Sequence, residues 1–331
     1  MAACKSWMHW HDKLHRQLLR QRDLLPDGST LLLAISGGQD SMALLGLLMG
    51  LQRLHHWQFQ LWHGDHGWHI QSAATANELE VWCKEQNLCI HINTSTPKTT
   101  GTEASARAWR YQKLAALSKE LCCRTVLTAH TASDRAETLL LQMARGADLA
   151  GLGSLRLIRP LQSDVPSSPK LVRPLLSFSR SDTAQICCDL QLPIWLDPSN
   201  TNSAFCRNRI RNEVLPVLEE LHPGCSQRIS ALSERVSQVE NSQRTLATLA
   251  LEQLRCDGGL LRSELTDLPE GTRRILLSHW FKERGIRPLS SSHLSALSVA
   301  IGPGCPPGCR SLPDQMTLQW TRDSVQLECN W

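Results

Sequence analysis

Along the first 200 positions, segments with the hydrophobic pattern of a strand alternate with segments that have the pattern of a helix. Short apolar or alternating runs predict strands, and each is followed by apolar residues recurring every three or four positions, as on one face of a helix. The expected strands are 31–35, 57–61, 88–92, 125–129 and 171–175. The expected helices are 44–54, 72–86, 102–121, 134–145 and 181–191. This alternation predicts an α/β fold, a doubly wound parallel sheet with helices on both faces.

The pattern changes after about residue 210. Residues 213–255 have an almost wholly helical periodicity, and residues 260–331 form a smaller region of mixed pattern. A chain of 331 residues is long enough for two domains. We therefore expect a catalytic domain at 1–210, followed at 211–331 by a helical connection and a small C-terminal region.

Composition excludes several classes of protein. Hydrophobic residues make up 41% and charged residues 20% of the chain, as in folded domains rather than disordered ones. The longest nearly unbroken apolar run, Ala43–Leu51, is far shorter than the roughly 20 residues of a membrane span. Charges interrupt residues 1–25, which predicts a short surface helix rather than a secretory signal. We expect a cytoplasmic protein with no membrane partner.

The 13 cysteines suggest no disulfide framework, because they are scattered and no CxxC pair occurs. In a chain without a secretory signal, such cysteines are typically reduced and behave as small hydrophobic residues. Cys305 and Cys309 have no second pair of ligands at zinc-site spacing, which argues against a metal there. The net charge of +4 is too small to identify a partner.

Three histidines, His63, His66 and His69, follow one another at a spacing of three. This spacing would gather them only on a helix, whereas Gly64 and Gly67 favour a strand end and a loop. A contact of His66 with a nucleotide is the interpretation we favour, and a metal site is the alternative.

The strongest candidate for chemistry is the segment Ser36–Ser41, which follows a buried strand and precedes an apolar-faced helix. Its two adjacent glycines let the backbone approach an anion, and amides of the first helical turn then point at a phosphate. The carboxylate of Asp40 would repel a phosphate, which indicates a bridging Mg²⁺. The Walker lysine and the GxGxxG spacing are both absent. A glycine turn capped by serines is the plain alternative.

This segment resembles the pyrophosphate-binding loop of the N-type ATP pyrophosphatases, or PP-loop proteins. Further segments that resemble one branch of them, the tRNA(Ile)-lysidine synthase family, follow in order. They are Gly64–Gly67, Ala106–Tyr111, Thr128–Thr138, Met143–Gly153, Arg173–Leu176, Asp197–Asn200 and Arg207–Arg211. One such motif is weak, but the series covers residues 31–215 and is specific.

The resemblance implies a ligase that forms a carbon–nitrogen bond on an adenine nucleotide alpha hydrolase-like, Rossmann-like fold. ATP would adenylate O2 of the wobble cytidine in the CAU anticodon of tRNA(Ile). The ε-amine of free L-lysine would then attack C2 and release AMP, giving lysidine. ATP and Mg²⁺ are the implied cofactors, tRNA(Ile) and L-lysine the implied partners, and a homodimer is left open.

The resemblance also implies roles for individual residues. The expected ATP-binding residues are Ser36, Gly37, Gly38, Gln39, Asp40, Ser41, Asp65 and His66. Asp40 would hold Mg²⁺ through ATP, and Arg110 would neutralise charge on the α-phosphate. Asp134 and Glu137, three residues apart on one helix face, would bind the lysine amine, and His130 would place ATP or the adenylate. The alternatives are a dipole-stabilised carboxylate at Asp134 and a solvated arginine at Arg110.

Arg207, Arg209 and Arg211 put three positive charges into five residues. We expect them to contact tRNA phosphates, with a solvated helix start as the alternative. Thr131 and Ser133 stand where the family has a histidine and an aspartate. These departures put a two-aspartate mechanism in doubt.

Three other functions are weighed against this interpretation. A tRNA thiolase on the same loop needs a cysteine pair for a persulfide or a cluster, and the absence of CxxC counts against it. An amidotransferase relative needs a glutaminase domain, for which the chain has no room. The intact loop at Ser36–Ser41 argues against a non-catalytic tRNA-binding relative.

Overall fold

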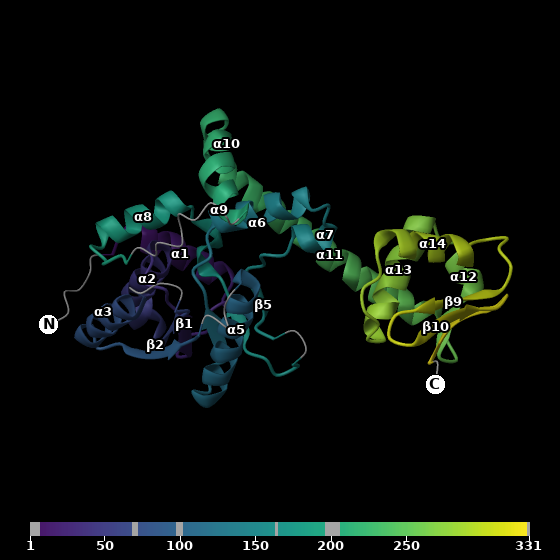
Figure 1. Ribbon diagram of the computed structural model, residues 1–331, viewed down its shortest axis with the longest axis horizontal. Helices are drawn as coiled ribbons and strands as arrows, with labels where there is room; N and C mark the ends of the chain where they lie inside the picture. The colour runs from purple at the N-terminus through teal and green to yellow at the C-terminus, as the bar shows by residue number, and fades with distance from the viewer. Residues whose placement is uncertain (1–6, 68–71, 97–101, 163–164, 196–205, 330–331) are drawn as a thin grey trace. The chain divides into compact units, whose positions relative to one another are not determined.

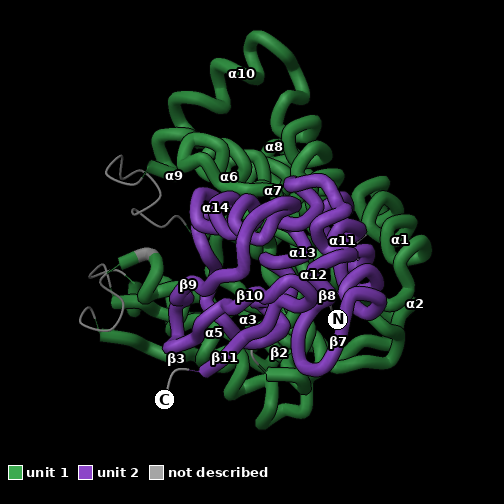
Figure 2. The backbone as a smooth tube through the Cα atoms, turned by 90° about the vertical axis from the view of Figure 1, so that its right-hand side faces the viewer, with its two compact units in different colours: residues 1–237 green, residues 238–331 purple. Residues whose placement is uncertain are grey.

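The computed structural model describes residues 7–67, 72–96, 102–162, 165–195 and 206–329 (Figure 1). The chain divides into two compact units, residues 1–237 and 238–331 (Figure 2). Each unit is described by itself below.

The first unit is built on a six-stranded sheet with the order β3-β2-β1-β4-β6-β5. Its strands are β1 (Thr30–Ala34), β2 (Gln58–Asp65), β3 (Cys89–Thr94), β4 (Thr125–Leu127), β5 (Ile158–Pro160) and β6 (Lys170–Val172). All neighbouring pairs are parallel except β5 and β6, which are antiparallel. The chain runs from β1 outward to β3 and then returns to β4 on the other side of β1. The predicted doubly wound sheet is confirmed, and its switch point lies between β1 and β4.

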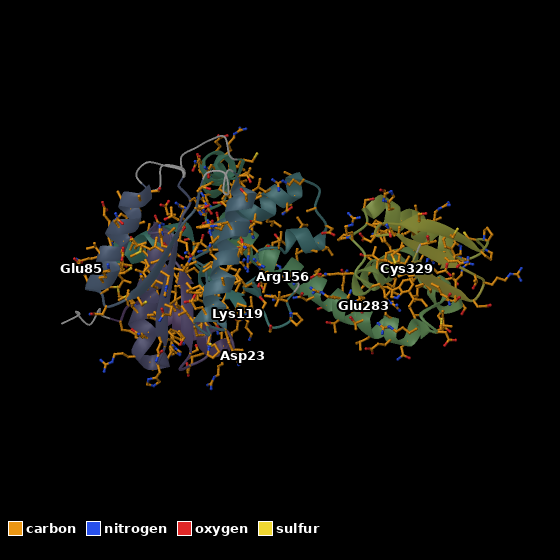
Figure 3. The ribbon with its side chains drawn as sticks, turned by 60° about the horizontal axis from the view of Figure 1, so that its bottom comes forward. Asp23, Glu85, Lys119, Arg156, Glu283 and Cys329 are labelled. Carbon is orange, nitrogen blue, oxygen red and sulfur yellow. The ribbon has the colours of Figure 1, made fainter. Side chains whose placement is uncertain are left out.

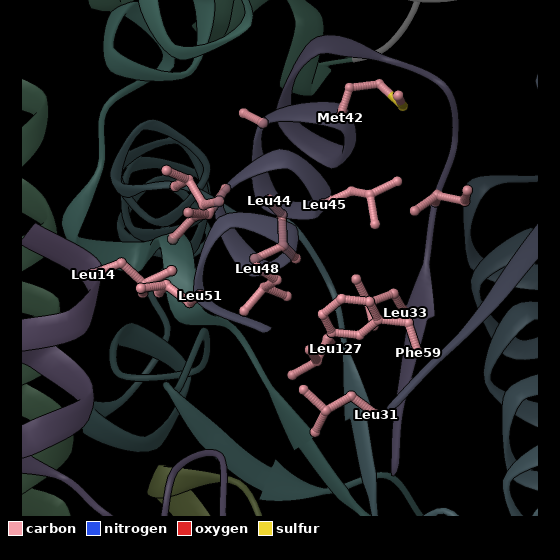
Figure 4. Close-up of a cluster of buried hydrophobic side chains, with 14 of the residues drawn as sticks. Leu14, Leu31, Leu33, Met42, Leu44, Leu45, Leu48, Leu51, Phe59 and Leu127 are labelled. Carbon is pink, nitrogen blue, oxygen red and sulfur yellow. The ribbon is translucent and has the colours of Figure 1, made fainter. Parts of the chain in front are cut away.

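Helices cover both faces of this sheet. They are α1 (His9–Arg20), α2 (Gln39–His55), α3 (Ser72–Glu85), α5 (Glu103–Glu120), α6 (Ala132–Ala144) and α8 (Arg180–Asp189), with a 3₁₀ turn, η1 (Pro174–Ser177), while the short α7 (Leu149–Leu152) lies beside α6. Leu31 and Leu33 of β1 belong to the buried cluster of α2 (Figure 4). Leu32 belongs to a second cluster with Leu114 of α5. Because successive strand side chains point to opposite faces, α2 and α5 lie on opposite faces of the sheet.

The first unit extends beyond the boundary that we expected at residue 210. It includes α9 (Cys206–Arg209), a π-helical turn, η3 (Ile210–Val214), α10 (Leu215–Leu221) and the start of α11 (Cys225–Leu254). Arg135 of α6 forms an ion pair of 2.8 Å with Glu234, and Ser233 donates to the carbonyl of Leu152 at 2.8 Å. The change to helical periodicity near 210 therefore marks a change of secondary structure, while the packing continues to Ser237.

The second unit combines the end of α11 with a five-stranded antiparallel sheet of order β7-β8-β11-β10-β9. Its elements are β7 (Arg255–Cys256), β8 (Gly259–Leu261), α12 (Arg262–Thr266), α13 (Glu270–Glu283), α14 (Ser291–Ile301), β9 (Gly308–Leu312), β10 (Met316–Trp320) and β11 (Ser324–Cys329). Leu277 and Trp280 of α13 share a core with Leu318 and Val325 of the sheet. Burying each such side chain contributes roughly 1.5–3 kcal/mol, so this unit has a core of its own.

The described residues contain no candidate membrane span and no candidate cluster of three or more metal-ligating side chains. No helix there is both long enough and apolar enough to span a membrane. Within the same residues, no group of three or more His, Cys, Asp or Glu side chains could hold a metal ion. His69, one of the three spaced histidines, lies outside the described residues, as does the segment Asp197–Asn200.

Candidate active site

The segment Ser36–Ser41 comprises the turn after β1 and the first residues of α2, at the carboxyl edge of the sheet. Gly37 has a φ of +81°, a left-handed conformation, and a Cβ there would come within 3.2 Å of the Trp195 ring. The hydroxyl of Ser36 accepts from the amide of Gly38 at 3.2 Å, and that of Ser41 donates to the carbonyl of Gly38 at 2.8 Å. The serines thus brace a turn whose helix begins at its tip. Amides at such a helix start lack helical partners and can bind an anion.

Asp40 lies in the first turn of α2 and is held by α8. Thr183 donates to its carboxylate at 2.5 Å, and the guanidinium of Arg180 lies 3.6 Å away. Burial, followed by the nearby carboxylate of Asp134, raises the pKa of Asp40 to about 6 despite these two contacts. The contacts with Thr183 and Arg180 therefore do not fully balance the negative charge of the Asp40 carboxylate. An undercompensated carboxylate beside an anion-binding turn fits a divalent cation such as Mg²⁺.

The side chain of Gln39 is bound by α8, and a contact of this residue with ATP stays a prediction. Its amide nitrogen donates to Thr183 Oγ1 at 2.8 Å and to the carbonyl of Arg180 at 2.7 Å. Gln39 thereby fixes the helix that holds Asp40, and the structure gives it a bracing contact.

Asp134 and Glu137 lie together on α6, as their spacing predicts. Both are buried, with 7% and 0% of their surface exposed. Asp134 also caps its own helix, because its carboxylate accepts from the amide of Thr131 at 2.8 Å and from its hydroxyl at 3.0 Å. Thr131, which replaces the family's histidine, is therefore the N-cap of α6.

Arg207 and Arg211 neutralise these two carboxylates. Each guanidinium lies 3.0 Å from Asp134 Oδ1, and their Nε atoms lie 2.8 and 2.6 Å from the carboxylate of Glu137. Burial alone would raise the pKa of Asp134, but Arg207, His130 and Arg211 together lower it to about 2. The four side chains form a cluster of two negative and two positive charges.

The three arginines predicted to contact tRNA are thus separated by the structure. Arg207 and Arg211 are four residues apart and share a helix face turned toward α6. Arg209 is exposed and pairs with Glu213 at 2.9 Å. A phosphate contact by these arginines stays a prediction, and for Arg207 and Arg211 it would require breaking buried ion pairs. The alternating sequence pattern concealed this division, which helical spacing could have revealed.

His130 follows β4 at the same edge of the sheet. Its Nδ1 lies 3.0 Å from the hydroxyl of Thr128. Burial, and then the positive charge of Arg173, lowers the pKa of His130 well below its ordinary value. His130 is therefore a neutral imidazole at neutral pH, able to accept a proton or a hydrogen bond.

The remaining predicted residues lie near the end of β2. Arg110 of α5 approaches His66, with 3.3 Å between Nη2 and Nε2. Asp65 accepts from the amide of Gly67 at 2.8 Å and so shapes the loop after the strand. His63 is buried against the carbonyl of Ile35 at 3.0 Å, a contact between neighbouring strands.

Three polar residues at this edge were not among the predicted site residues. Arg180 and Thr183 of α8 surround Asp40, as described above. Arg173 follows β6, is fully buried and donates to the carbonyl of Arg156 at 2.6 Å. Arg173 stood within the expected strand 171–175, and only its place just after β6 brings it to the carboxyl edge.

Comparisons with known proteins agree with this arrangement. Residues 11–218 match the family model described as the PP-loop domain. The chain is 53% identical over 323 residues to a tRNA(Ile)-lysidine synthase of Parasynechococcus marenigrum, covering 98% of this chain and 96% of the relative. It is 47% identical over 330 residues to a tRNA(Ile)-lysidine synthase of Prochlorococcus marinus, covering 98% of this chain and 97% of the relative.

One solved structure has a similar fold. It is the U34-tRNA thiolase NcsA from Methanococcus maripaludis with its [4Fe-4S] cluster, with a TM-score of 0.56 and 19% identity. The similarity covers 69% of this chain and 78% of the thiolase. At this identity, the likeness concerns the fold alone.

Proposed function

The chain belongs to the tRNA(Ile)-lysidine synthase family of PP-loop proteins, and from this premise we propose the reaction that its site carries out. ATP adenylates O2 of the wobble cytidine in the CAU anticodon of tRNA(Ile). The ε-amine of L-lysine then displaces AMP at C2, and lysidine, AMP and diphosphate are the products. One observation carries this proposal: Arg180, whose guanidinium lies 3.6 Å from Asp40, donates its amide to Ser133 at 3.2 Å, directly beside Asp134, so the anion-binding turn and the carboxylate pair belong to one site.

The turn at Ser36–Ser41 is suited to the first step. In that step, O2 forms a bond to the α-phosphorus, and the bond between the α- and β-phosphates breaks. Amides at the start of α2 and the hydroxyls of Ser36 and Ser41 would hold the departing diphosphate. Asp40 would hold Mg²⁺, which when bound neutralises negative charge on the phosphates.

The Asp134–Glu137 pair is suited to the second step. In that step, a C2–N bond forms and the C2–O2 bond breaks, so the oxygen leaves with AMP. The lysine ammonium must first be bound and must lose a proton. Two buried carboxylates attract a cation, and the neutral imidazole of His130 lies at the same edge of the sheet to accept a proton.

Arg207 and Arg211 already balance the charge of this pair. A third cation therefore binds well only if one guanidinium gives up part of its contact with Asp134 or Glu137. We propose that lysine enters by replacing such a contact. Under this proposal, the arginines keep two buried carboxylates ionised until the substrate arrives.

Transfer of radiolabelled lysine tests the proposed function. The protein is incubated with ATP, Mg²⁺, labelled L-lysine and an isoleucine tRNA with a CAU anticodon. We expect one label per tRNA and one AMP per label. A tRNA whose wobble cytidine is replaced by uridine is the matched control and should take up no label. If no label were transferred to the CAU tRNA while a related enzyme assayed in parallel was active, the proposal would be contradicted.

A tRNA thiolase remains the alternative function. The solved thiolase is described with a [4Fe-4S] cluster, and the described residues of this chain contain no group of three or more His, Cys, Asp or Glu side chains that could hold a metal ion. The ligase is therefore the function that the described site supports better. A homodimer, a cytoplasmic location and a tRNA-binding role for residues 211–331 stay predictions.

A further inference from the structure

Three arginines from three elements surround Tyr111, the one tyrosine of the sequence. The Cζ atom of Arg107, one turn earlier on α5, lies 5.6 Å from the centre of the tyrosine ring. That of Arg159, on β5, lies 4.8 Å from it. Arg173, directly after β6, lies near enough for its positive charge to act on the tyrosine phenol. We call these four residues the Tyr111 cluster.

The positive charge of the Tyr111 cluster is not compensated by the described part of the chain. No carboxylate there forms an ion pair with Arg107, Arg159 or Arg173. The Nε atom of Arg173, which is fully buried, has no hydrogen-bond partner among the described residues. Burying an unpaired cation such as Arg173 is costly, so such a cluster indicates a site for an anion that the described part of the chain does not supply.

Tyr111 responds to this charge but does not cancel it. Burial alone would raise the pKa of its phenol, yet Arg107, Arg173 and Arg159 lower it to about 8. At neutral pH the phenol is therefore mostly protonated, and the cluster keeps most of its three positive charges.

The position of the cluster separates it from the phosphates of ATP. The turn at Ser36–Ser41 leads into α2, whereas Tyr111 belongs to α5 on the opposite face of the sheet. In the sheet, β6 and β5 are two and three strands from β1, about 10 and 15 Å at the usual strand spacing. The cluster nevertheless adjoins the reaction centre, because the charge of Arg173 reaches His130.

We propose that Arg107, Arg159 and Arg173, arranged around Tyr111, bind a backbone phosphate of the substrate RNA beside the nucleotide that is modified. Arg107, which is exposed, and Arg159, which is half-buried, make the contact, while buried Arg173 supplies charge from below. Such a contact fixes the position of the RNA without reading its bases. The inference rests on the proposed function, since it takes the substrate to be tRNA. It gives the Tyr111 cluster a contact of the kind that we had expected of Arg207, Arg209 and Arg211.

Salt-dependent binding of an anticodon stem-loop RNA is the first test. Arg107→Ala and Arg159→Ala should each weaken binding about 3- to 10-fold and lower the slope of log K against log salt by about 0.7–0.9. The matched control is Lys119→Ala, because Lys119 is exposed and lies in the last turn of the same helix, two turns beyond Tyr111 (Figure 3). Unchanged affinity and slope in both arginine variants, or an equal loss in the control, would overturn the inference.

The single tyrosine supplies a second readout that a general loss of structure would not imitate. In protein carrying isotope-labelled tyrosine, one resonance reports the phenol, and it should titrate with a pKa of about 8 in the free protein. A bound phosphate offsets the arginines, so saturating stem-loop RNA should raise this pKa by about one unit or more. ATP with Mg²⁺ alone should leave it unchanged. An equal shift with ATP would assign the cluster to the nucleotide, and no shift with RNA would remove it from RNA binding.

The two proposals fail in different ways. Transfer of labelled lysine by the unaltered protein reports the reaction, whereas the RNA affinity and the tyrosine resonance report the cluster. A protein that binds RNA through the cluster but transfers no lysine loses the proposed reaction only. A protein that transfers lysine with no response of Tyr111 loses the inference only.

Discussion

The two compact units bury arginine in different ways. In the second unit, Arg262 donates to the carbonyls of Thr321 and Cys305 at 2.6 Å each and to that of Ile301 at 3.1 Å. In the first unit, Arg207 and Arg211 contact two carboxylates, and Arg173 faces a tyrosine and two further arginines. All four are largely or fully buried. Arg262 uses its donors on several backbone carbonyls that never titrate, whereas Arg173 donates to the one carbonyl of Arg156 and its Nε has no partner among the described residues.

The difference separates a structural arginine from a functional one. A guanidinium bound by several carbonyls ties loops together and has little left to offer a ligand. A guanidinium that faces ionisable groups sets their pKa values, and one with an unpaired donor is prepared for an anion. The contacts of an arginine, rather than its burial, therefore indicate its role.

The largest effect is expected where the structural arginine is removed. Arg262→Leu leaves several buried carbonyls without a donor and should lower the free energy of unfolding by about 4 kcal/mol. The exposed Arg322 on the same unit is the matched control, and Arg322→Leu should change it by less than about 0.5 kcal/mol. Urea unfolding measures both. A loss below about 1 kcal/mol for Arg262→Leu would remove the distinction drawn above.

The ion pairs of the first unit should give the next largest effect. Arg207→Met leaves Asp134 and Glu137 undercompensated and should cost about 3 kcal/mol, whereas Arg209→Met, at an exposed pair, should cost less than about 0.5 kcal/mol. Urea unfolding measures both. Equal losses of unfolding free energy in the two variants would show that the buried ion pairs stabilise the protein no more than the exposed pair does.

The same cluster should make stability depend on acid in a definite direction. The pKa of Asp134 is about 2 in the folded protein, below its ordinary value of 3.8. Its contribution is therefore complete above the ordinary value and is lost as the pH falls toward 2. The stability gap between wild type and Arg207→Met should narrow over that range in urea unfolding. A gap that stays constant with pH would contradict this assignment.

A smaller effect, on the pH dependence of activity rather than on stability, is expected when Asp40 loses a hydrogen bond. Thr183→Val removes a hydrogen bond that favours the carboxylate, so the pKa of Asp40 should rise from about 6 by about one unit. The acid limb of kcat/KM for ATP should move to higher pH, with about tenfold less activity on that limb. Ser181→Ala, on the exposed side of α8, is the control. If the acid side of the kcat/KM profile did not move, Asp40 would not be the group whose ionisation controls the binding of ATP.

The smallest effect on stability is expected at Arg173. Arg173→Met exchanges a buried, uncompensated charge for an apolar chain of similar length and should change the free energy of unfolding by less than about 1 kcal/mol. The pKa of Tyr111 should rise at the same time. A loss of more than about 2 kcal/mol in urea unfolding would make Arg173 a structural arginine like Arg262.

The sequence predicts the first unit well because its strands are buried on both faces. Leu31, Leu32 and Leu33 leave a continuous apolar run that few other structures produce. The short strand β5 was not predicted, since its three residues are partly exposed and run antiparallel at the sheet edge. The antiparallel sheet of the second unit was also not predicted, because its short strands give little periodic signal.

The candidate site also has a part that the local sequence predicts and a part that it does not. Ser36–Ser41 is contiguous, so its turn and its chemistry can be inferred from the local sequence. The contacts of Asp134 with Arg207, and of Asp40 with Thr183, join elements 73 and 143 residues apart. Such contacts depend on packing between helices, which periodicity does not specify.

Separating the two steps of the reaction is the most direct test of the proposed mechanism. ATP labelled at its α-phosphate is incubated with tRNA(Ile) in the absence and presence of lysine, using wild type, Asp40→Asn and Asp134→Asn. We expect Asp134→Asn to form adenylated tRNA that lysine does not discharge, and Asp40→Asn to form about 100-fold less of it than wild type. If both variants fail at the same step, or if Asp40→Asn adenylates normally, the division of labour between the turn and the carboxylate pair is wrong.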